Sequence, residues 1–536
     1  MKKLWSLIKA CMTDNMSLFK IKKKDKTKKN GKILTAILCI ILGVSIYSYA
    51  DRFMVMLVMQ NSEHVLLSLF TFLVTVLIIV EGIYKAGSLI FNCKDDDLLL
   101  SLPIKKSTVV FIRLLKFYVF ELLYSTLFLL PSMVAYVTHT SVTATFYVVS
   151  MVAIFLIPII PIAISSFIGA IISATSLKFK HKNIVQIVIS MLALLGALYV
   201  SFNMQGMINN IGNNAGIIES FISKVYYPAY LYSKLATNFN VSDFIIFIAI
   251  NVTVSLITIF VISKIYFKIN TGLKKVQECS KKRAYRIKVC KPQVALIKKE
   301  LKKAFNTPVL ITNAIFGMVL FVVACVVIAI KFDALLAIPQ ESMPFTTEQL
   351  NENVPTILFM LITFGALTSS ITSSMISLEG KSFIVLKSVP VKPYTIMMSK
   401  VYTAVLIMMP FVFIGDLIFY VRFNFNLIEI ILTLVASIVM PFIAELIGIL
   451  VNLRYPEMNA TADAEVVKQS SSSNICALIG IIAVFITAVL LTSIVGMGCK
   501  AIWAMLIADI AHSFILVLLI KRTKGKGVER FNKIDV

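Results

Sequence analysis

Long apolar runs separated by short polar segments form the main pattern of this chain. A run of about 20 apolar residues is long enough to cross the hydrocarbon of a bilayer as an α-helix. The pattern predicts about twelve such spans, at residues 32–50, 64–92, 110–137, 144–175, 183–204, 242–266, 308–331, 353–377, 396–421, 425–452, 474–497 and 501–520. The sequence therefore predicts an all-α polytopic membrane protein.

Two short charged segments interrupt the apolar pattern at equivalent places, between the second and third span of each half. They are KDDDLLLSLPIKKSTVVFIR at 94–113 and LEGKSFIVLKSVPVKPYTIMMSK at 378–400. Aligned on Pro103 and Pro390, they end in Arg113 and Lys400, at a constant offset of about half the chain. Such an offset indicates an internal duplication. Because each half holds six spans, we expect two parallel repeats with both charged segments on one side of the membrane.

An amphipathic helix is predicted ahead of each half, at residues 1–20 and 292–305. In the second of these, the apolar face is predicted to consist of Val294, Ile297, Leu301 and Phe305. Helices of this kind lie in the membrane interface or pack beneath the spans. The chain is thus predicted to divide into a connecting helix and basic tail (1–31), a first six-span half (32–266), a basic linker with the second connecting helix (267–307), a second six-span half (308–520) and a basic tail (521–536).

The composition agrees with a membrane protein, because 58% of the residues are hydrophobic and the charges gather in a few blocks. The net charge is +25, with 52 lysines and arginines. Most of these lie in segments that the twelve-span topology assigns to the cytoplasm, as the positive-inside rule requires. This distribution is explained by topology and attraction to anionic lipid, so no nucleic-acid partner is expected. Both termini are expected to be cytoplasmic.

Motifs for enzymatic chemistry are missing from the sequence. It contains no P-loop, no nucleophile elbow, no HExxH motif and no soluble segment long enough for a nucleotide-binding domain. The eight cysteines form no CxxC motif or Cys/His cluster, so no metal site is expected. We therefore expect a non-enzymatic chain that binds no cofactor itself.

Five ionisable side chains inside the predicted spans are candidates for an intramembrane polar site: Glu81, Glu121, Glu445, Asp509 and His512. A charge in hydrocarbon costs about 2.5 to 3.5 kcal/mol on insertion scales, so each is expected to face the bundle interior or a partner. Lys85, one turn after Glu81, is expected to neutralise it. Asp509 and His512 on adjacent turns are expected to form a polar pair that packs helices. Asp416, near the outer end of its span, is expected to reach water.

Each charged segment is predicted to contain a short helix with an acidic start, an apolar face and a proline at its end. Such a helix between two spans suits insertion into a groove on a soluble motor, whose movement it would carry into the membrane. The alternative is an interfacial helix lying on lipid. The residues expected to form this coupling surface are Asp95, Asp96, Asp97, Leu98, Leu99, Leu102, Pro103, Glu379, Gly380, Lys381, Phe383, Leu386 and Pro390.

With these segments the chain resembles the membrane-spanning permease subunit of a bacterial ABC transporter, of the exporter-like class in its fused twelve-span form. The segments that carry the resemblance are KDDDLLLSLPIKKS at 94–107, KKELKKAFNTPVLITNAIFG at 298–317, SLEGKSFIVLKSVPV at 377–391 and LRYPEMNATADAEVVKQ at 453–469. The resemblance covers most of the chain, with the segments in the right order.

The resemblance implies connecting helices at 1–20 and 292–305, coupling helices at 94–107 and 379–392, and export as the direction of transport. It implies two ATP-binding cassette ATPase subunits as separate partners, which would bind the ATP and Mg, and location in a bacterial cell membrane. A re-entrant outer hairpin is implied between spans five and six. Spans eleven and twelve are joined only by Gly496 to Lys500, so the hairpin would exist once.

Two other classes of membrane protein remain open. An ion-coupled secondary transporter also has twelve spans in two parallel repeats, and it would require Asp509, Glu445 or Glu121. A membrane sensor or scaffold is less favoured, because the outer segments are too short for a folded sensor domain. The 37 phenylalanines and 23 methionines would suit a hydrophobic, peptide or drug-like substrate, although lipid-facing spans have the same composition.

Overall fold

The fold is helical throughout the part of the chain that the structure describes. The computed structural model describes residues 26–59, 62–91, 105–176, 215–281, 290–336, 352–460 and 462–534, with isolated positions between 184 and 195. Within these ranges, eleven helical segments are long and apolar enough to cross a bilayer. They coincide with eleven of the predicted spans, and the predicted span at 183–204 lies largely outside the described residues. The predicted all-α polytopic fold is confirmed.

The chain divides into two compact units, the first containing Ile33–Tyr285 and the second containing Arg286–Val536 together with Asp25–Lys32. The division between the units falls inside the segment predicted as a basic linker, 267–307. The arrangement of the two halves as parallel repeats stays a prediction. Each unit is therefore described by itself.

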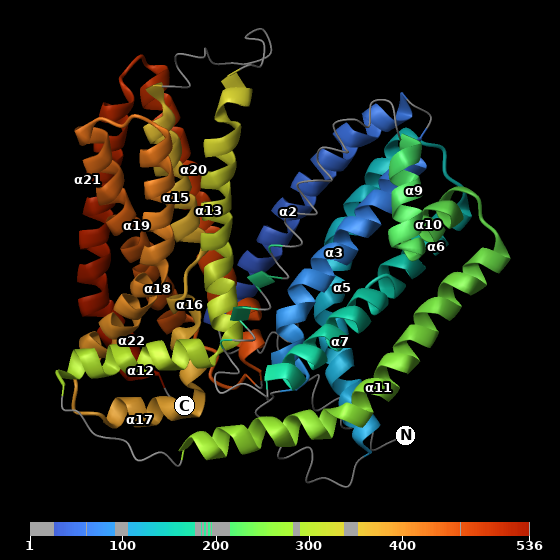
Figure 1. The fold of residues 1–536 in the computed structure, drawn as a ribbon, viewed down its shortest axis with the longest axis horizontal. Coiled ribbons are helices and arrows are strands. Elements are labelled where there is room, and N and C mark those ends of the chain that lie inside the picture. Colours follow the sequence, from blue (N-terminus) through green and yellow to red (C-terminus); the bar gives the residue numbers. More distant parts are fainter. Residues whose placement is uncertain are drawn as a thin grey trace. The chain divides into compact units, whose positions relative to one another are not determined.

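The first unit is built around α3. Its helices are α2 (Lys26–Val58), α3 (His64–Leu89), α5 (Lys106–His139), α6 (Ala144–Leu156), α7 (Ile159–Ser176), α9 (Ala215–Val225), α10 (Tyr227–Thr237) and α11 (Val241–Lys281). α3 packs against α5, α7 and α10 (Figure 1). A Cβ atom at Gly82 of α3 would stand 2.5 Å from Ser165 Oγ of α7, so this close approach requires glycine.

Two features of the first unit refine the predicted elements. The predicted hairpin between spans five and six contains two short helices, α9 and α10, and α10 packs on α3 and α6. Ser233 Oγ in α10 donates to His64 O at 2.9 Å. α11 continues well past residue 266 to Lys281, so the beginning of the predicted linker is a continuation of the sixth span.

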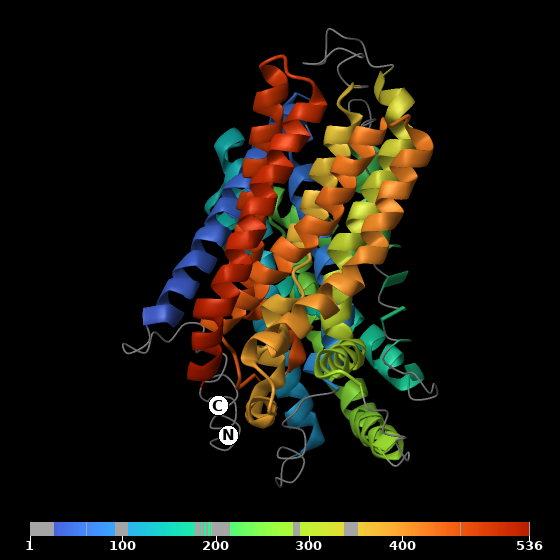
Figure 2. The ribbon, with the colours of Figure 1, turned by 90° about the vertical axis from the view of Figure 1, so that its left-hand side faces the viewer.

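The second unit contains α12 (Pro292–Asn306), α13 (Pro308–Leu336), α15 (Val354–Thr368), α16 (Thr372–Met375), η4 (Ser377–Ser382), α17 (Phe383–Ser388), α18 (Pro393–Arg422), α19 (Leu427–Arg454), η5 (Glu465–Gln469), α20 (Ser471–Gly496), α21 (Ala501–Arg522), η6 (Thr523–Gly527) and α22 (Val528–Lys533). The long helices lie side by side, and the short helices α12 and α17 lie at one end of them (Figures 1 and 2).

Local sequence signals fix where several of these helices start. Proline occupies the beginning of α12, α13 and α18, where its missing N–H costs nothing. Asn426 and Glu429 form a capping box at the start of α19, in which the Asn426 backbone N–H donates to Glu429 Oε2 at 2.9 Å. Ser470 caps α20 by accepting from the backbone N–H of Ser473 at 3.2 Å.

α12 packs on the second unit through a face that differs from its predicted apolar face. The helix buries Leu296, Glu300 and Ala304, whereas Val294 and Phe305 are exposed. A polar residue belongs to the buried stripe because Glu300 is neutralised there, as described below. The helix therefore keeps apolar side chains for the membrane interface while it packs on the unit through a different face.

The predicted C-terminal tail is folded onto the second unit. After Arg522, the helical chain continues without a break through the π-helical segment η6 into α22. Phe531 and Ile534 are buried in the same core as Phe383. Residues 521–534 are therefore part of the second unit.

Candidate functional site

The first-half coupling surface lies outside the described residues. This applies to Asp95, Asp96, Asp97, Leu98, Leu99, Leu102 and Pro103, and also to the first connecting helix at residues 1–20. Their predicted roles stay predictions. The second-half surface is described completely, and its geometry follows.

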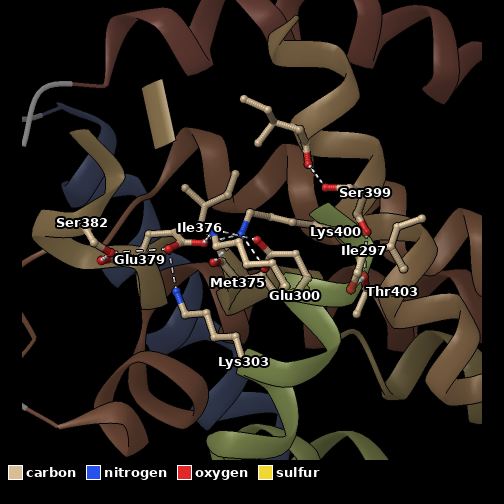
Figure 3. Close-up of polar contacts among 12 residues, drawn as sticks. Ile297, Glu300, Lys303, Met375, Ile376, Glu379, Ser382, Ser399, Lys400 and Thr403 are labelled. Carbon is tan, nitrogen blue, oxygen red and sulfur yellow. Dashed lines mark hydrogen bonds and ion pairs between the residues drawn. The ribbon is translucent and has the colours of Figure 1, made fainter. Parts of the chain in front are cut away.

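Buried ion pairs join three elements around Lys400, the eighth residue of α18 (Figure 3). Lys400 Nζ donates to Glu300 Oε2 of α12 at 2.8 Å and to Glu379 Oε1 of η4 at 2.7 Å. Its third proton is directed to Met375 O at 3.4 Å. The Lys400 side chain is 0% exposed, and those of Glu300 and Glu379 are 1% and 3% exposed. All three donors of the ammonium are therefore used inside the protein.

Two more lysines of α12 complete what we call the Lys400 cluster: Lys299, Glu300, Lys303, Glu379 and Lys400. Lys303 Nζ lies 2.7 Å from Glu379 Oε2. Lys299 Nζ lies 3.2 Å from Glu300 Oε1 and 3.4 Å from Glu379 Oε1. Burial lowers the pKa of Lys303 below its usual value, and attraction to Glu379 opposes that shift. The cluster connects α12, η4 and α18 through charge-assisted hydrogen bonds.

The backbone turns sharply directly after Glu379. Gly380 has φ +52° and ψ −136°, a conformation that side chains with a Cβ strongly disfavour. The turn separates η4, which carries Glu379 inward, from α17, which starts at Phe383. Gly380 itself is buried, and Lys381 is exposed beside it. Of the predicted docking residues, Glu379 is thus committed to the Lys400 cluster and is not available to a partner.

Phe383 and Leu386 of α17 are buried in the core of the second unit. The Phe383 and Phe531 rings lie 4.9 Å apart between centroids. Lys387 Nζ holds the C-terminal segment in place by donating to Asn532 O at 2.8 Å and Ile534 O at 2.7 Å. The sequence correctly predicts an apolar face here, but this face is covered by the protein itself.

The opposite face of α17 remains exposed. Ile384 is 57% exposed and Val385 is 67% exposed, and Val389 and Pro390 follow at the exposed end of the element. These four residues form what we call the α17 surface. Adjacent aliphatic side chains with this exposure are unusual outside contact sites or lipid.

The span that leads into this element is discontinuous. α15 ends at Thr368 and α16 begins at Thr372. Glu445 of α19 satisfies the break, because its carboxylate accepts from the backbone N–H of Ile371 at 2.9 Å and of Thr372 at 2.8 Å. Thr372 Oγ1 donates in turn to Glu445 O at 2.6 Å. The prediction that Glu445 faces the bundle interior is confirmed.

Asn452, two turns further along α19, satisfies the next backbone groups. Its Oδ1 accepts from the backbone N–H of Ile376 at 2.9 Å and of Ser377 at 3.1 Å. Its Nδ2 donates to Ser377 Oγ at 2.8 Å and to Ser472 Oγ at 3.0 Å. α19 therefore supports the chain from the break in the span to the start of η4.

In the first unit, two of the predicted intramembrane candidates pair with a single lysine. Lys85 Nζ lies 2.9 Å from Glu81 Oε1 and 3.1 Å from Glu121 Oε1. Tyr124 OH also donates to Glu81 Oε1 at 2.9 Å. The Lys85 side chain is 1% exposed and that of Glu121 is 0% exposed. The predicted neutralisation of Glu81 by Lys85 is confirmed, and Glu121 shares it.

The remaining candidates differ from expectation. Asp509 and His512 do not pair, because His512 Nε2 lies 3.1 Å from Thr487 Oγ1 and neither Asp509 oxygen has a hydrogen-bond partner among the described residues. Asp416 does not reach water, since it is buried and accepts from Ser437 Oγ at 2.7 Å. Asp416 contacts α19 through Ser437, and His512 contacts α20 through Thr487. Contacts between helices of this kind do not follow from the sequence of one helix alone.

Several members of the site were not among the predicted functional residues: Lys299, Glu300, Lys303, Lys400 and Asn452. Glu300 lies among four lysines in α12, where periodicity alone assigns a single carboxylate to a solvent-exposed face. Lys400 does have a sequence signal, since it aligns with Arg113 in the repeat. Asn452 also has one, an amide in an otherwise apolar run.

Comparison with known proteins gives a match to one family. Residues 32–522 match the model of a family described as membrane protein of 12 TMs. The chain belongs to this family. The twelve-span membrane protein has eleven of its spans in the described residues, and the match extends across both units. No curated protein and no solved structure matches the chain.

Proposed function

We propose that this twelve-span protein is the membrane-spanning permease subunit of an ABC transporter. Two separate ATPase subunits, which bind ATP and Mg, would supply the energy, and the chain itself would carry out no catalysis. The observation that carries the proposal is the exposed α17 surface on an element tied into the spans by the Lys400 cluster. A short rigid helix with exposed aliphatic residues suits docking into a groove of a soluble partner.

The path from the α17 surface into the membrane is short. A force on α17 acts through η4 on Glu379, whose carboxylate is bonded to Lys400 of α18 and Lys303 of α12. Both helices would therefore move with α17 as one body. This stiffness suits a lever that transmits closure of the ATPase dimer to the spans.

The predicted topology indicates on which side of the membrane α12 and α17 lie. By the positive-inside rule, α12, α17 and both termini would lie in the cytoplasm, where the proposed ATPase subunits would dock. The resemblance described above implies a bacterial cell membrane and export. A hydrophobic, peptide or drug-like compound is the proposed cargo, since the abundance of Met and Phe suits an adaptable apolar path.

Substitution of the α17 surface tests the docking. The variant Ile384→Glu/Val385→Glu is expected to lose co-purification of the ATPase subunits from native membranes in mild detergent, because it places charge at an apolar contact. Val294→Glu on the exposed side of α12 is the matched control and should retain the ATPase. A well-inserted Ile384→Glu/Val385→Glu protein that still brings down its full complement of ATPase would overturn the assignment.

An ion-coupled secondary transporter is the second candidate, and the discontinuous span favours it. Interrupted helices near bound ions are typical of such transporters, and Glu445 occupies the break between α15 and α16. Proteoliposomes that contain only this chain distinguish the candidates. Uptake driven by a pH or sodium gradient without ATP would select the second candidate, whereas flux that requires the ATPase subunits would select the first.

A further inference from the structure

A polar cluster inside the second unit takes no part in the Lys400 cluster or in the α17 surface. It consists of Asp509 and His512 on α21 and Thr356 on α15. Asp509 is 6% exposed and Thr356 is 5% exposed. Among the described residues, both carboxylate oxygens of Asp509, Thr356 Oγ1 and His512 Nδ1 have no hydrogen-bond partner. Asp509 and Thr356 are buried, whereas His512 is partly buried, and unpaired polar atoms at buried positions are costly in any protein.

These side chains lie at one level of the bundle. The rings of Phe359 on α15 and His512 on α21 are 6.0 Å apart and stacked. α15 and α21 run in the same direction, because the three spans between them in the chain, α18 to α20, alternate in direction (Figure 1). Thr356 lies about one turn before Phe359 on α15, and Asp509 lies about one turn before His512 on α21. Thr356 Oγ1 and the Asp509 carboxylate are therefore level with each other.

Among the described residues, neither Asp509 oxygen is paired with a lysine or an arginine. Its neighbours Ala504, Met505 and Ala508 belong to an apolar cluster that also includes Phe359 and Leu491. The helices packed against α21 are α15, α19 and α20. α15 and α20 contain no Asp, Glu, Lys, Arg or His. On α19, Glu429 is bonded at the capping box, Glu445 is bonded at the helix break, and Arg454 lies in the last turn.

Asp509 also lies deep in the membrane. It is about 12 Å from the start of α21 at 1.5 Å per residue, and about 20 Å from Arg522 at its end. A bare carboxylate at this depth is strongly unfavourable, so a positive charge must accompany it.

We propose that Asp509, with Thr356 and His512 beside it, binds a small monovalent cation, either a proton or Na⁺. A proton and Na⁺ would bind in the same way, because each would bring one positive charge to the Asp509 carboxylate. The hydroxyl oxygen of Thr356 would be the nearby polar atom in otherwise apolar surroundings. Oxygen ligands suit a hard cation, and a proton on the carboxylate would let it donate a hydrogen bond. The site is independent of the ABC proposal, because its cation is expected whether or not an ATPase supplies the energy.

The test is the thermal stability of the purified full-length chain in detergent. We expect the unfolding temperature to rise with NaCl, against choline chloride at equal ionic strength, if the ligand is Na⁺. We expect it to rise on mild acidification if the ligand is a proton. Asp509→Asn should abolish either response, whereas Asp333→Asn, an exposed carboxylate on α13, should retain it. A wild-type protein without either response, or an Asp509→Asn protein with the full response, would overturn the proposal.

A chemical measurement on the wild-type chain covers the case in which Asp509→Asn does not fold. A hydrophobic carbodiimide reacts with protonated carboxyl groups in apolar surroundings, and peptide mass spectrometry locates the adduct. We expect labelling at Asp509 that falls with Na⁺ or with rising pH. Absence of labelling at every pH in the absence of Na⁺, or labelling insensitive to both, would contradict cation binding at this site.

Discussion

Removal of the Lys400 ammonium is the sharpest test of the Lys400 cluster. Lys400→Met keeps most of the side-chain volume but leaves two buried carboxylates with fewer partners. Glu379 would retain Lys303 at 2.7 Å, whereas Glu300 would retain only the half-exposed Lys299 at 3.2 Å. Removing one partner from a buried ion pair costs about 3–5 kcal/mol, since it leaves a buried charge uncompensated. We expect a loss of this size in the free energy of unfolding.

The exposed ion pair of the same unit provides the matched control. Arg422 Nη2 lies 2.6 Å from Asp333 Oδ2, with side chains that are 40% and 75% exposed. Exposed pairs contribute about 0–1 kcal/mol because water screens them, so Asp333→Asn should change the free energy of unfolding by no more than that. The contrast between the two variants isolates the effect of burial.

Reversible unfolding in mixed micelles, followed by circular dichroism during titration with a denaturing detergent, measures both variants. The double variant Lys400→Met/Glu300→Gln should recover part of the loss, because it removes the uncompensated carboxylate together with its partner. A Lys400→Met protein as stable as Asp333→Asn, or strictly additive effects in the double variant, would refute the energetic account of the cluster.

Three further predictions concern the elements around α17. Gly380→Ala should lower the free energy of unfolding by about 1–3 kcal/mol because of its positive φ, whereas Gly496→Ala at an open helix end should be close to neutral; chemical unfolding compares them. Lys387→Ala should release the carbonyls of the C-terminal segment and increase hydrogen exchange in α22, measured by mass spectrometry, while exchange in α21 stays unchanged. Asn452→Leu should destabilise the protein by about 1–3 kcal/mol, since two buried backbone N–H groups lose their acceptor; an unchanged unfolding midpoint would contradict the capping role.

The spans could be predicted from the sequence because any helix that crosses the hydrocarbon of a bilayer needs about 20 predominantly apolar residues. The amphipathic helix at 292–305 could also be predicted, from the helical spacing of its apolar residues. This spacing did not predict which face of the helix is buried. Periodicity treats Glu300 as a surface residue, whereas Lys400, far away in the sequence, makes its burial possible. Which carboxylate is buried depends on a tertiary partner that local patterns do not contain.

The same limit explains the two surfaces of α17. Phe383 and Leu386 lie one helical turn apart, so the spacing of apolar residues favours their side of this short helix for docking. The structure covers them with Phe531 and Ile534, which lie almost 150 residues later, and exposes Ile384 and Val385 instead. The break between α15 and α16 did carry a signal, the run TSSITSSM at 368–375, since clustered Ser and Thr offer alternatives to helical hydrogen bonds.

The core beneath α17 also sets an order of events during synthesis. It combines Leu296, Phe383 and Leu453 with Phe531 and Ile534. The ribosome must therefore make nearly the whole second unit before this core can close. Until residue 534 has emerged, Phe383 and Leu386 lack their cover and present a larger apolar face than the finished protein does. Before this core closes, the nascent chain thus exposes a different surface, and chaperones that bind exposed apolar segments have a defined interval in which to act.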